Sequence, residues 1–259
     1  MFAAINGIDL YYEEAGQGET IIFIHGLGEN ASSWRHQLGH FSPNYRVVAM
    51  DLRGHGRSGD GEEFITMELF SRDILQLMDY LQIERAHFVG HSMGGLISQE
   101  IAAHHPERMI TMVLSDSAGY YPPPLGTTGL ETRLANIERL TMEEMADVIA
   151  AGACRSGAPS EVLQEVKNLF AANRKEPYRQ ATISTLQADY RAFHNNMQMP
   201  ALLLVGEYDQ TTPLAYAEFL QSALAASRLA VIPNAAHMTK LENPQEYNRL
   251  VGDFLRGIQ

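Results

Sequence analysis

Ser92 lies among three glycines in the stretch FVGHSMGGLISQE, which runs from Phe88 to Glu100. A short apolar run precedes this serine and an amphipathic run follows it, which predicts a sharp turn from a strand into a helix. Such a turn strains the backbone of its central residue, and Gly90 and Gly94 leave room for strand and helix to pass closely. The pattern G-x-S-x-G in this setting predicts a nucleophilic serine at the carboxyl edge of a sheet. A chance glycine-rich turn with a capping serine is the simpler alternative.

A serine hydroxyl is a weak nucleophile, so this hypothesis requires a histidine base and a carboxylate that orients the base. His237 follows RLAVIPNAA, the last strand-like run of the chain, and can reach the same sheet edge from its loop. His91 lies inside the turn and should point elsewhere. His25 and His55 lie in turns, where hydrogen bonds to the backbone are the more common use. We therefore predict that His237 is the base.

Two acidic residues end predicted strands in the order that follows the serine and precedes the histidine: Asp116 in VLSDS and Asp209 in VGEYDQ. We favour Asp209 as the residue that orients the base, with Asp116 as the alternative. Asp209 leads into a predicted turn before the next helix, so a structural cap could also explain it. Asp51 precedes the serine, and we expect it to stabilise its own loop.

Acyl transfer also needs two hydrogen-bond donors aimed at the tetrahedral oxyanion, each contributing about 3–4 kcal/mol. The backbone N–H of Met93, directly after the serine, is one candidate. The other is the N–H of Leu27 in the loop HGLG, which follows the predicted third strand. Because these donors belong to the backbone, both side chains are free to line a pocket.

The elements that must position these groups follow from the pattern of apolar residues. The stretch INGIDLYYEEAGQGE alternates around Asn6-Gly7 and predicts an opening β-hairpin. Continuous apolar runs of strand length then recur in TIIFIHG, RVVAMDLRG, AHFVGHS, TMVLSDS, ALLLVGEYD and RLAVIPNAAH, which is typical of parallel strands buried on both faces. Helical periods lie between them in SSWRHQLGHF, MELFSRDILQLMDYLQI and LISQEIAAHH. The alternation predicts a doubly wound, mostly parallel sheet.

This alternation breaks once, between Tyr120 and Met199, where three helical stretches and a fourth precede the next strand. We expect residues 1–119 and 200–259 to form the core and residues 120–199 to form a helical cap on it. Aromatic and methionine side chains of this segment could roof an apolar pocket or form the core of the cap: Tyr120, Tyr121, Met142, Met145, Phe170, Tyr190 and Phe193. Four residues are predicted to contact the substrate, namely His25, Trp34, Tyr120 and Met238.

The composition narrows the class of partners. The chain has 259 residues, enough for one large α/β domain, and a net charge of −12 with its 19 Lys and Arg scattered, so we expect neither nucleic acid nor a membrane surface as a partner. The longest apolar runs fall short of the roughly 20 residues that span a bilayer. Together with a start that lacks the features of a secretion signal, this predicts a cytoplasmic protein, a monomer or a homodimer.

No cofactor is expected. The histidines lack paired metal-ligand spacing, which predicts no metal site, and there is no glycine-rich phosphate loop. The single cysteine, Cys154, cannot form an intramolecular disulfide, and we expect it to be a small buried apolar side chain.

The motifs HGLGEN, MDLRGHGRS, GHSMGG, VGEYDQTTP and NAAHM occur in this order along nearly the whole chain, which resembles members of the α/β-hydrolase fold superfamily. The resemblance implies an eight-stranded, mostly parallel sheet with helices on both faces, a helical cap inserted after the sixth strand, and a triad of Ser92, Asp209 and His237. The stretch AAHMTKLENPQEYNRLVGDFL resembles the end of the 3-oxoadipate enol-lactonase group and its carboxylesterase relatives. This favours a serine hydrolase that cleaves a small carboxylic ester or lactone through an acyl-enzyme on Ser92.

Two alternatives stay open, because one fold hosts many chemistries. Carbon-carbon bond hydrolases of aromatic degradation share Ser-Met-Gly-Gly, although HGLGEN lacks their longer glycine and proline pattern. A ligand-binding or signalling protein could use the same pocket as a receptor. Haloalkane dehalogenases and epoxide hydrolases need a carboxylate nucleophile, which Ser92 is not.

Overall fold

The computed structural model describes residues 1–123 and 125–258. Its strands are β1 (Phe2–Ile5), β2 (Ile8–Ala15), β3 (Thr20–Ile24), β4 (Arg46–Met50), β5 (Ala86–His91), β6 (Met109–Ser115), β7 (Ala201–Gly206) and β8 (Ser227–Ile232). They form one eight-stranded sheet in the order β1-β2-β4-β3-β5-β6-β7-β8. The pairs β1 with β2 and β2 with β4 are antiparallel, and all other pairs are parallel. The predicted, mostly parallel sheet is confirmed.

The burial of the strands follows their sequence patterns. Every residue of β3, β5 and β7 is buried, as expected for central strands with continuous apolar runs. β2 instead alternates between buried and more exposed positions, and β8, at the end of the sheet, has one fully buried residue, Ile232. The central strands are therefore fixed by packing on both faces, and their carboxyl ends present loops at one edge.

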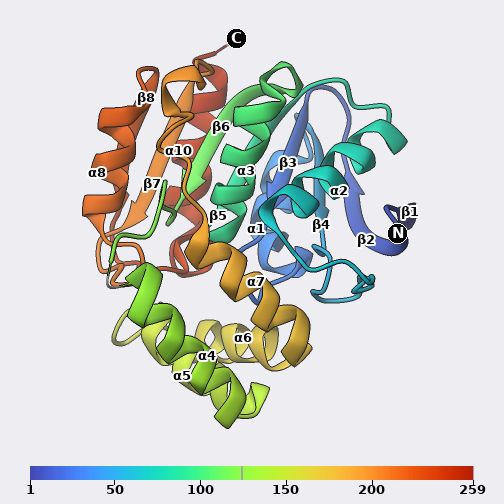
Figure 1. Ribbon diagram of the computed structural model, residues 1–259. Coiled ribbons are helices and arrows are strands. Elements are labelled where there is room, and N and C mark those ends of the chain that lie inside the picture. Colours follow the sequence, from blue (N-terminus) through green and yellow to red (C-terminus); the bar gives the residue numbers. More distant parts are fainter. Residues whose placement is uncertain (124, 259) are drawn as a thin grey trace.

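Helices cover both faces of the sheet (Figure 1). On one face lie α1 (Arg35–Phe41) and α10 (Pro244–Arg256), whose buried side chains share an apolar cluster with alternate residues of the strands. On the other face lie α2 (Met67–Tyr80), α3 (Met93–His104) and α8 (Leu214–Ala223), which belong to a second and larger cluster. The short elements are η1 (Ala31–Trp34), η2 (Pro106–Arg108), η3 (Leu125–Gly129), η4 (His194–Asn196) and α9 (Thr239–Glu242).

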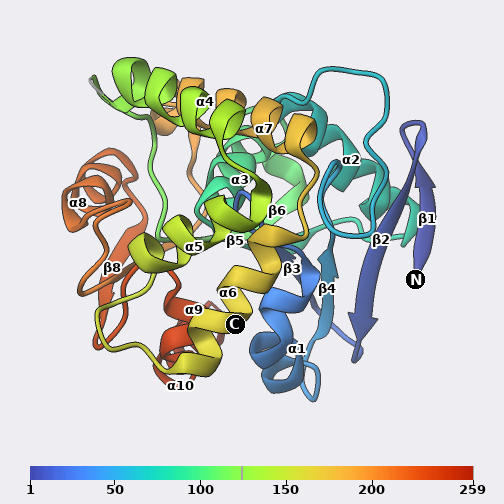
Figure 2. The same ribbon diagram turned by 90° about the horizontal axis from the view of Figure 1, so that it is seen from below.

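Four helices lie between β6 and β7 in the chain: α4 (Leu130–Arg139), α5 (Met142–Ala153), α6 (Ser160–Ala171) and α7 (Lys175–Gln187). They correspond to the four predicted helical stretches, and we refer to the chain between β6 and β7 as the insertion. Figure 1 shows them gathered at the end of the molecule toward which the parallel strands point, and Figure 2 shows them from below. Their apolar cluster includes Met238 and Leu241, which come from the core side, so the insertion packs directly on the loops at the sheet edge.

No helix among residues 1–123 and 125–258 is both long and apolar enough to cross a membrane.

Candidate active site

Ser92 lies at a strained turn between β5 and α3. Its backbone has φ +52° and ψ −114°, a region that residues with a side chain rarely adopt. A Cβ atom on Gly90 would collide with the carbonyl oxygen of Gly94, and one on Gly94 would collide with that of Ile24. The two glycines therefore permit the close approach that the turn requires, and the turn raises the serine side chain at the carboxyl edge of the sheet.

The structure brings Ser92, His237 and Asp209 into one chain of hydrogen bonds. His237 Nε2 lies 3.0 Å from Ser92 Oγ, and His237 Nδ1 lies 2.9 Å from Asp209 Oδ2. Asp209 Oδ1 accepts hydrogen bonds from the backbone N–H groups of Thr211 (2.7 Å) and Thr212 (3.0 Å). Its other oxygen, Oδ2, accepts from the Thr212 hydroxyl at 2.8 Å as well as contacting the imidazole. The carboxylate thus holds its own turn and also contacts His237, the two roles considered for it.

Burial and mutual contact shift the pKa values of Asp209 and His237. Burial alone would raise the pKa of Asp209, but His237 and the hydrogen bonds from Thr212 lower it well below its usual value. Burial would lower the pKa of His237, but the charge of Asp209 and its hydrogen bond raise it above its ordinary value. An ionised Asp209 holds the proton of His237 on Nδ1, so that Nε2 is available to accept the proton of Ser92.

Asp116 and Asp51, the other acidic candidates, make different contacts. Asp116 Oδ1 accepts from the N–H of Gly206 at 2.9 Å, and its other oxygen accepts from Thr239 Oγ1. Burial and the nearby charge of Asp209 raise the pKa of Asp116 well above its usual value. Asp51 accepts from backbone N–H groups of its own and a neighbouring loop. Of the three carboxylates, only Asp209 is hydrogen-bonded to His237.

The two candidate oxyanion donors lie on the sequence segments expected for them. Met93 is the first residue of α3, and Leu27 lies in the turn after β3. In the described part of the chain, neither backbone N–H donates a hydrogen bond to another residue. The Leu27 side chain lines the cavity described next, whereas the Met93 side chain is fully buried.

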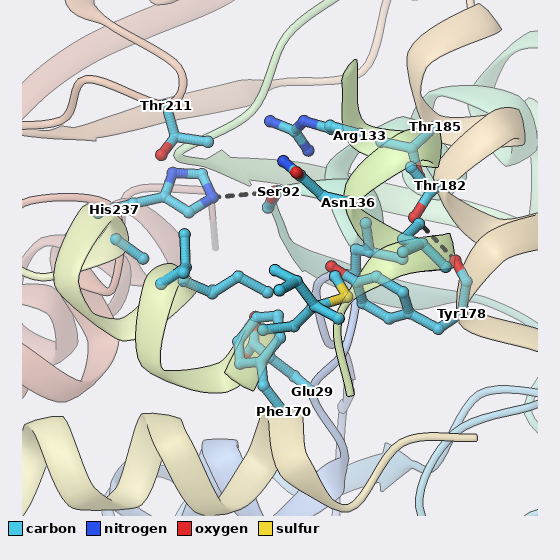
Figure 3. A pocket seen from close by; sticks show the side chains of 18 of the residues that line it. Glu29, Ser92, Arg133, Asn136, Phe170, Tyr178, Thr182, Thr185, Thr211 and His237 are labelled. Carbon is cyan, nitrogen blue, oxygen red and sulfur yellow. Dashed lines mark hydrogen bonds between the residues drawn. The ribbon is translucent and has the colours of Figure 1, made fainter. Parts of the chain in front are cut away.

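A cavity of about 270 Å³ lies between the serine and the insertion, as Figure 3 shows from close by. Its wall is apolar in most places and polar in a few: Leu27, Glu29, Ser92, Tyr121, Arg133, Asn136, Ile137, Leu140, Met145, Val148, Ile149, Gly152, Ala153, Phe170, Tyr178, Thr182, Thr185, Thr211, His237 and Met238. The insertion supplies most of these residues, so it shapes the space that a substrate of Ser92 would occupy.

The insertion also holds the loop that carries His237. The backbone N–H of His237 donates to the carbonyl oxygen of Ala153, the last residue of α5, at 2.9 Å. The Glu242 carboxylate accepts from the N–H of Ala236 (2.7 Å) and from the N–H of Arg155 (2.9 Å). Hydrogen bonds therefore connect the histidine loop to the end of α5.

A model of the alpha/beta hydrolase fold family matches residues 19–244. The chain belongs to this family. The match spans the turn at Ser92, the Asp209 turn and the His237 loop, and it includes the insertion.

This α/β hydrolase is similar to several enzymes of the family. It is 29% identical to 3-oxoadipate enol-lactonase 2 of Acinetobacter baylyi over 94% of this chain and 92% of the relative. It is also 29% identical to 2-hydroxy-6-oxo-6-phenylhexa-2,4-dienoate hydrolase of Comamonas testosteroni, over 98% and 96%. The crystal structure of the enol-lactonase from Burkholderia xenovorans LB400 superimposes with a TM-score of 0.91 at 29% identity, over 99% and 100% of the two chains. These relatives support hydrolase activity.

Two of the four residues predicted to contact the substrate lie in the core of this α/β hydrolase instead. His25 is fully buried, with Nδ1 2.8 Å from the carbonyl oxygen of Gly26 and Nε2 accepting from the N–H of Leu52 at 2.9 Å. Trp34 is fully buried at the end of η1, and its ring packs on Phe23 with 5.1 Å between centroids. Neither residue lines the cavity.

Of the other two residues predicted to contact the substrate, one lines the cavity and one does not. Met238 lines the cavity, next to His237. Tyr120 does not line it, since its ring packs on Phe219 with centroids 5.2 Å apart. Its neighbour Tyr121 lines the cavity in its place, because Tyr120 forms an isolated β-bridge and neighbouring side chains of extended backbone point in opposite directions.

The sequence patterns did not indicate the polar residues of the cavity wall. Arg133 and Asn136 lie one helical turn apart on α4, and Figure 3 shows both extending toward the side of the cavity where Ser92 and His237 lie. Three threonines, Thr182, Thr185 and Thr211, add hydroxyl groups. Only the i, i+3 spacing of Arg133 and Asn136 could have shown that these two share a helix face.

The apolar residues of the insertion serve both of the uses considered for them. Tyr121, Met145 and Phe170 line the cavity, whereas Met142 is buried among the apolar side chains of the insertion. Tyr190, like Tyr121, also packs in the larger core cluster. In the described residues, no group of three or more His, Cys, Asp or Glu is arranged to hold a metal ion.

Proposed function

We propose that this α/β hydrolase is a serine hydrolase that cleaves a small carboxylic ester or lactone through an acyl-enzyme on Ser92. The observation that carries the proposal is the chain of hydrogen bonds from Ser92 Oγ to His237 and on to Asp209, at the wall of a cavity. A buried base within hydrogen-bond distance of a strained serine is the arrangement that activates a hydroxyl group.

The mechanism follows from this geometry. His237 Nε2 accepts the proton of Ser92 as Oγ attacks the carbonyl carbon, while the N–H groups of Leu27 and Met93 stabilise the oxyanion. The imidazolium then gives its proton to the leaving alkoxide, and an acyl group remains on Ser92. A water molecule that gives a proton to His237 attacks this ester in turn, and Ser92 recovers its proton as the acid leaves.

The size of the cavity between Ser92 and the insertion favours a small substrate. We propose that residues 120–199 act as a cap on the core formed by residues 1–119 and 200–259. The cavity of about 270 Å³ is slightly smaller than the roughly 300–1,000 Å³ of typical ligand pockets. A short acyl group or a small lactone ring fits this size.

The position of Arg133 is an argument for a substrate that carries an acidic group. Its side chain is half-buried at the cavity wall, and it forms no ion pair within residues 1–123 and 125–258. Burial raises the pKa of both Tyr121 and Tyr178 to about 12, and the charge of Arg133 opposes this rise at both tyrosines. A cation kept at the cavity wall of a protein with net charge −12 favours an anionic substrate.

The test is a series of p-nitrophenyl esters from acetate to laurate, measured as initial rates with Ser92→Ala as the blank. We expect Ser92-dependent release that is fastest for short acyl chains. Release by Ser92→Ala at the wild-type rate would contradict the role of Ser92.

The second candidate function is cleavage of a carbon-carbon bond, which the named relative from Comamonas testosteroni favours. The same protein is therefore tested with 2-hydroxy-6-oxo-6-phenylhexa-2,4-dienoate. Turnover of this compound without ester hydrolysis would favour the second function. A compound that raises the melting temperature without being consumed by folded protein would favour a receptor.

A further inference from the structure

Three charged or titratable side chains are buried together at the cavity, where Glu29 forms part of the wall: Glu29 (2% exposed), His91 (0%) and Lys240 (0%). We call them the Glu29 network. Lys240 Nζ donates to Glu29 Oε2 at 2.5 Å, and His91 Nδ1 lies 2.6 Å from Glu29 Oε1. Lys240 Nζ also lies 4.6 Å from the ring centroid of Trp34. The proposed mechanism uses none of the three side chains.

The network contacts both loops on which the proposed mechanism depends. Glu29 Oε1 accepts a hydrogen bond from the N–H of Gly26 at 3.2 Å, directly before the candidate oxyanion donor Leu27. His91 Nε2 lies 2.7 Å from the carbonyl oxygen of His237. His91 is also the residue before Ser92, so the three side chains join the oxyanion loop, the serine turn and the histidine loop.

The position of the oxyanion loop depends on the Glu29 carboxylate. A Cβ atom on Gly26 would lie 2.5 Å from Glu29 Oε1, 3.0 Å from His91 Nδ1 and 3.2 Å from Ser92 Cβ. The loop backbone therefore packs directly on this carboxylate and on the serine. Burial alone would raise the pKa of Glu29, but Lys240 and His91 hold it well below its usual value. Lys240 is thus the counter-charge that keeps Glu29 ionised and fixed.

Stability alone is a weak reason for such a network. Burying two charges costs free energy that their attraction often only offsets, and well-packed apolar side chains of similar size frequently stabilise a protein as much. A small displacement of catalytic groups, by contrast, can lower a rate about 100-fold. We therefore look for the role of this buried ion pair in the positions of the oxyanion loop and the His237 loop, which it contacts.

We propose that Glu29, His91 and Lys240 are positioning residues that fix the oxyanion loop relative to His237. The inference rests on the proposed function, because it assigns the network a role in a reaction at Ser92. It assigns no contact with the reacting atoms to any of the three residues. The network acts through Gly26 N–H on one side and through the His237 carbonyl on the other.

The experiment measures the second-order rate constant for labelling of Ser92 by a fluorophosphonate probe, beside kcat and KM for p-nitrophenyl acetate. The variants are Glu29→Gln, Lys240→Met and the double variant, and Ser92→Ala controls for labelling at other sites. We expect the labelling rate and kcat to fall about 10- to 100-fold in all three variants, with KM changed less than about threefold. In the double variant no buried charge lacks its partner, so its melting temperature should recover relative to Lys240→Met while its labelling rate stays low.

A matched control removes another buried ion pair, Arg53 with Asp73, whose side chains are 1% and 0% exposed and 2.8 Å apart. Neither residue lines the cavity. The double variant Arg53→Met with Asp73→Asn should alter the melting temperature without slowing the labelling of Ser92.

The outcomes separate the two proposals. If the probe labels the wild type and the single variants at the same rate, the positioning role is overturned. A double variant whose labelling rate recovers together with its melting temperature would overturn it too. Folded wild-type protein that the probe does not label would instead overturn the proposed function itself, and the positioning role with it.

Discussion

Asp209 Oδ2 lies 2.9 Å from His237 Nδ1, although Asp116 follows the neighbouring strand β6 at the same sheet edge. The two carboxylates differ in what their oxygens contact. Both oxygens of Asp209 accept hydrogen bonds from its own turn, and Oδ2 also contacts the imidazole. Asp116 is committed to Gly206 and Thr239. The contact with His237 is thus made by Asp209, the acid that the sequence favoured, and not by the alternative Asp116.

Replacing Asp209 by Asn should lower kcat for a p-nitrophenyl ester by about 10⁴-fold, because the amide no longer holds the required tautomer of His237. Asp116→Asn should lower it less than about 10-fold, since Asp116 is not bonded to the base. Equal losses in the two variants, each shown to be folded, would contradict the assignment of Asp209.

The pH dependence of kcat/KM should report His237. Only the neutral imidazole can accept the proton of Ser92, so activity should fall as the pH drops through the pKa of His237, which Asp209 raises above its ordinary value. The Asp209→Asn variant lacks the negative charge that raises the pKa of His237. The midpoint of its pH profile of residual activity should therefore move to lower pH. Profiles between about pH 5 and about pH 9 check both statements. A midpoint that is the same in both proteins would mean that another group limits the rate.

Arg133→Met should reduce the preference for acidic substrates. The measured quantity is the ratio of kcat/KM for the mono-p-nitrophenyl ester of a dicarboxylic acid to that for the neutral ester of equal length, from succinate to suberate. A hydrogen bond to a charged group contributes about 1.5–3 kcal/mol, so the ratio should fall about 10- to 100-fold.

Arg179→Met is the matched control for this prediction. It removes the same charge from α7 of the insertion, at a half-buried side chain that pairs with Glu176 and does not line the cavity. The control should keep the wild-type ratio. A ratio near one in wild-type protein would argue against an acidic substrate while leaving ester hydrolysis itself in place.

Gly94→Ala should destabilise the protein by about 2 kcal/mol or more, because the new Cβ collides with the backbone of β3. Gly39→Ala provides the contrast. It adds a Cβ in the open on α1, which should stabilise the protein by up to about 1 kcal/mol. Thermal and urea unfolding of the two variants would check the opposite signs.

The sheet and the serine turn could be predicted because their signals are local. Continuous apolar runs mark strands buried on both faces, and Gly90 and Gly94 mark a close approach of backbone. The positions of His237 and Asp209 followed from the rule that loops at the carboxyl ends of parallel strands share one edge.

The cavity wall and the Glu29 network could not be predicted, because they depend on contacts between distant segments. Lys240 reads as an ordinary charged residue in the chain, and the carboxylate that keeps it buried lies 211 residues earlier. The sequence predicted a substrate contact at Tyr120, but the cavity is lined by the next residue, Tyr121. The β-bridge of Tyr120 with Asp189 decides which of the two adjacent tyrosines points into the cavity. Side-chain direction at such places follows from tertiary pairing.

The hydrogen bond from the His237 N–H to the Ala153 carbonyl has a consequence for protein engineering. Exchanging the insertion for that of another enzyme, in order to graft a new specificity, would also exchange the acceptor that holds the backbone of the base. A functional chimera would need a helix that ends with a carbonyl oxygen at the place of Ala153 and an amide at the place of Arg155 for Glu242 to accept from. Grafts whose junctions lie after Arg155 would keep both groups, and they would exchange only the part of the cavity wall formed by Phe170, Tyr178, Thr182 and Thr185.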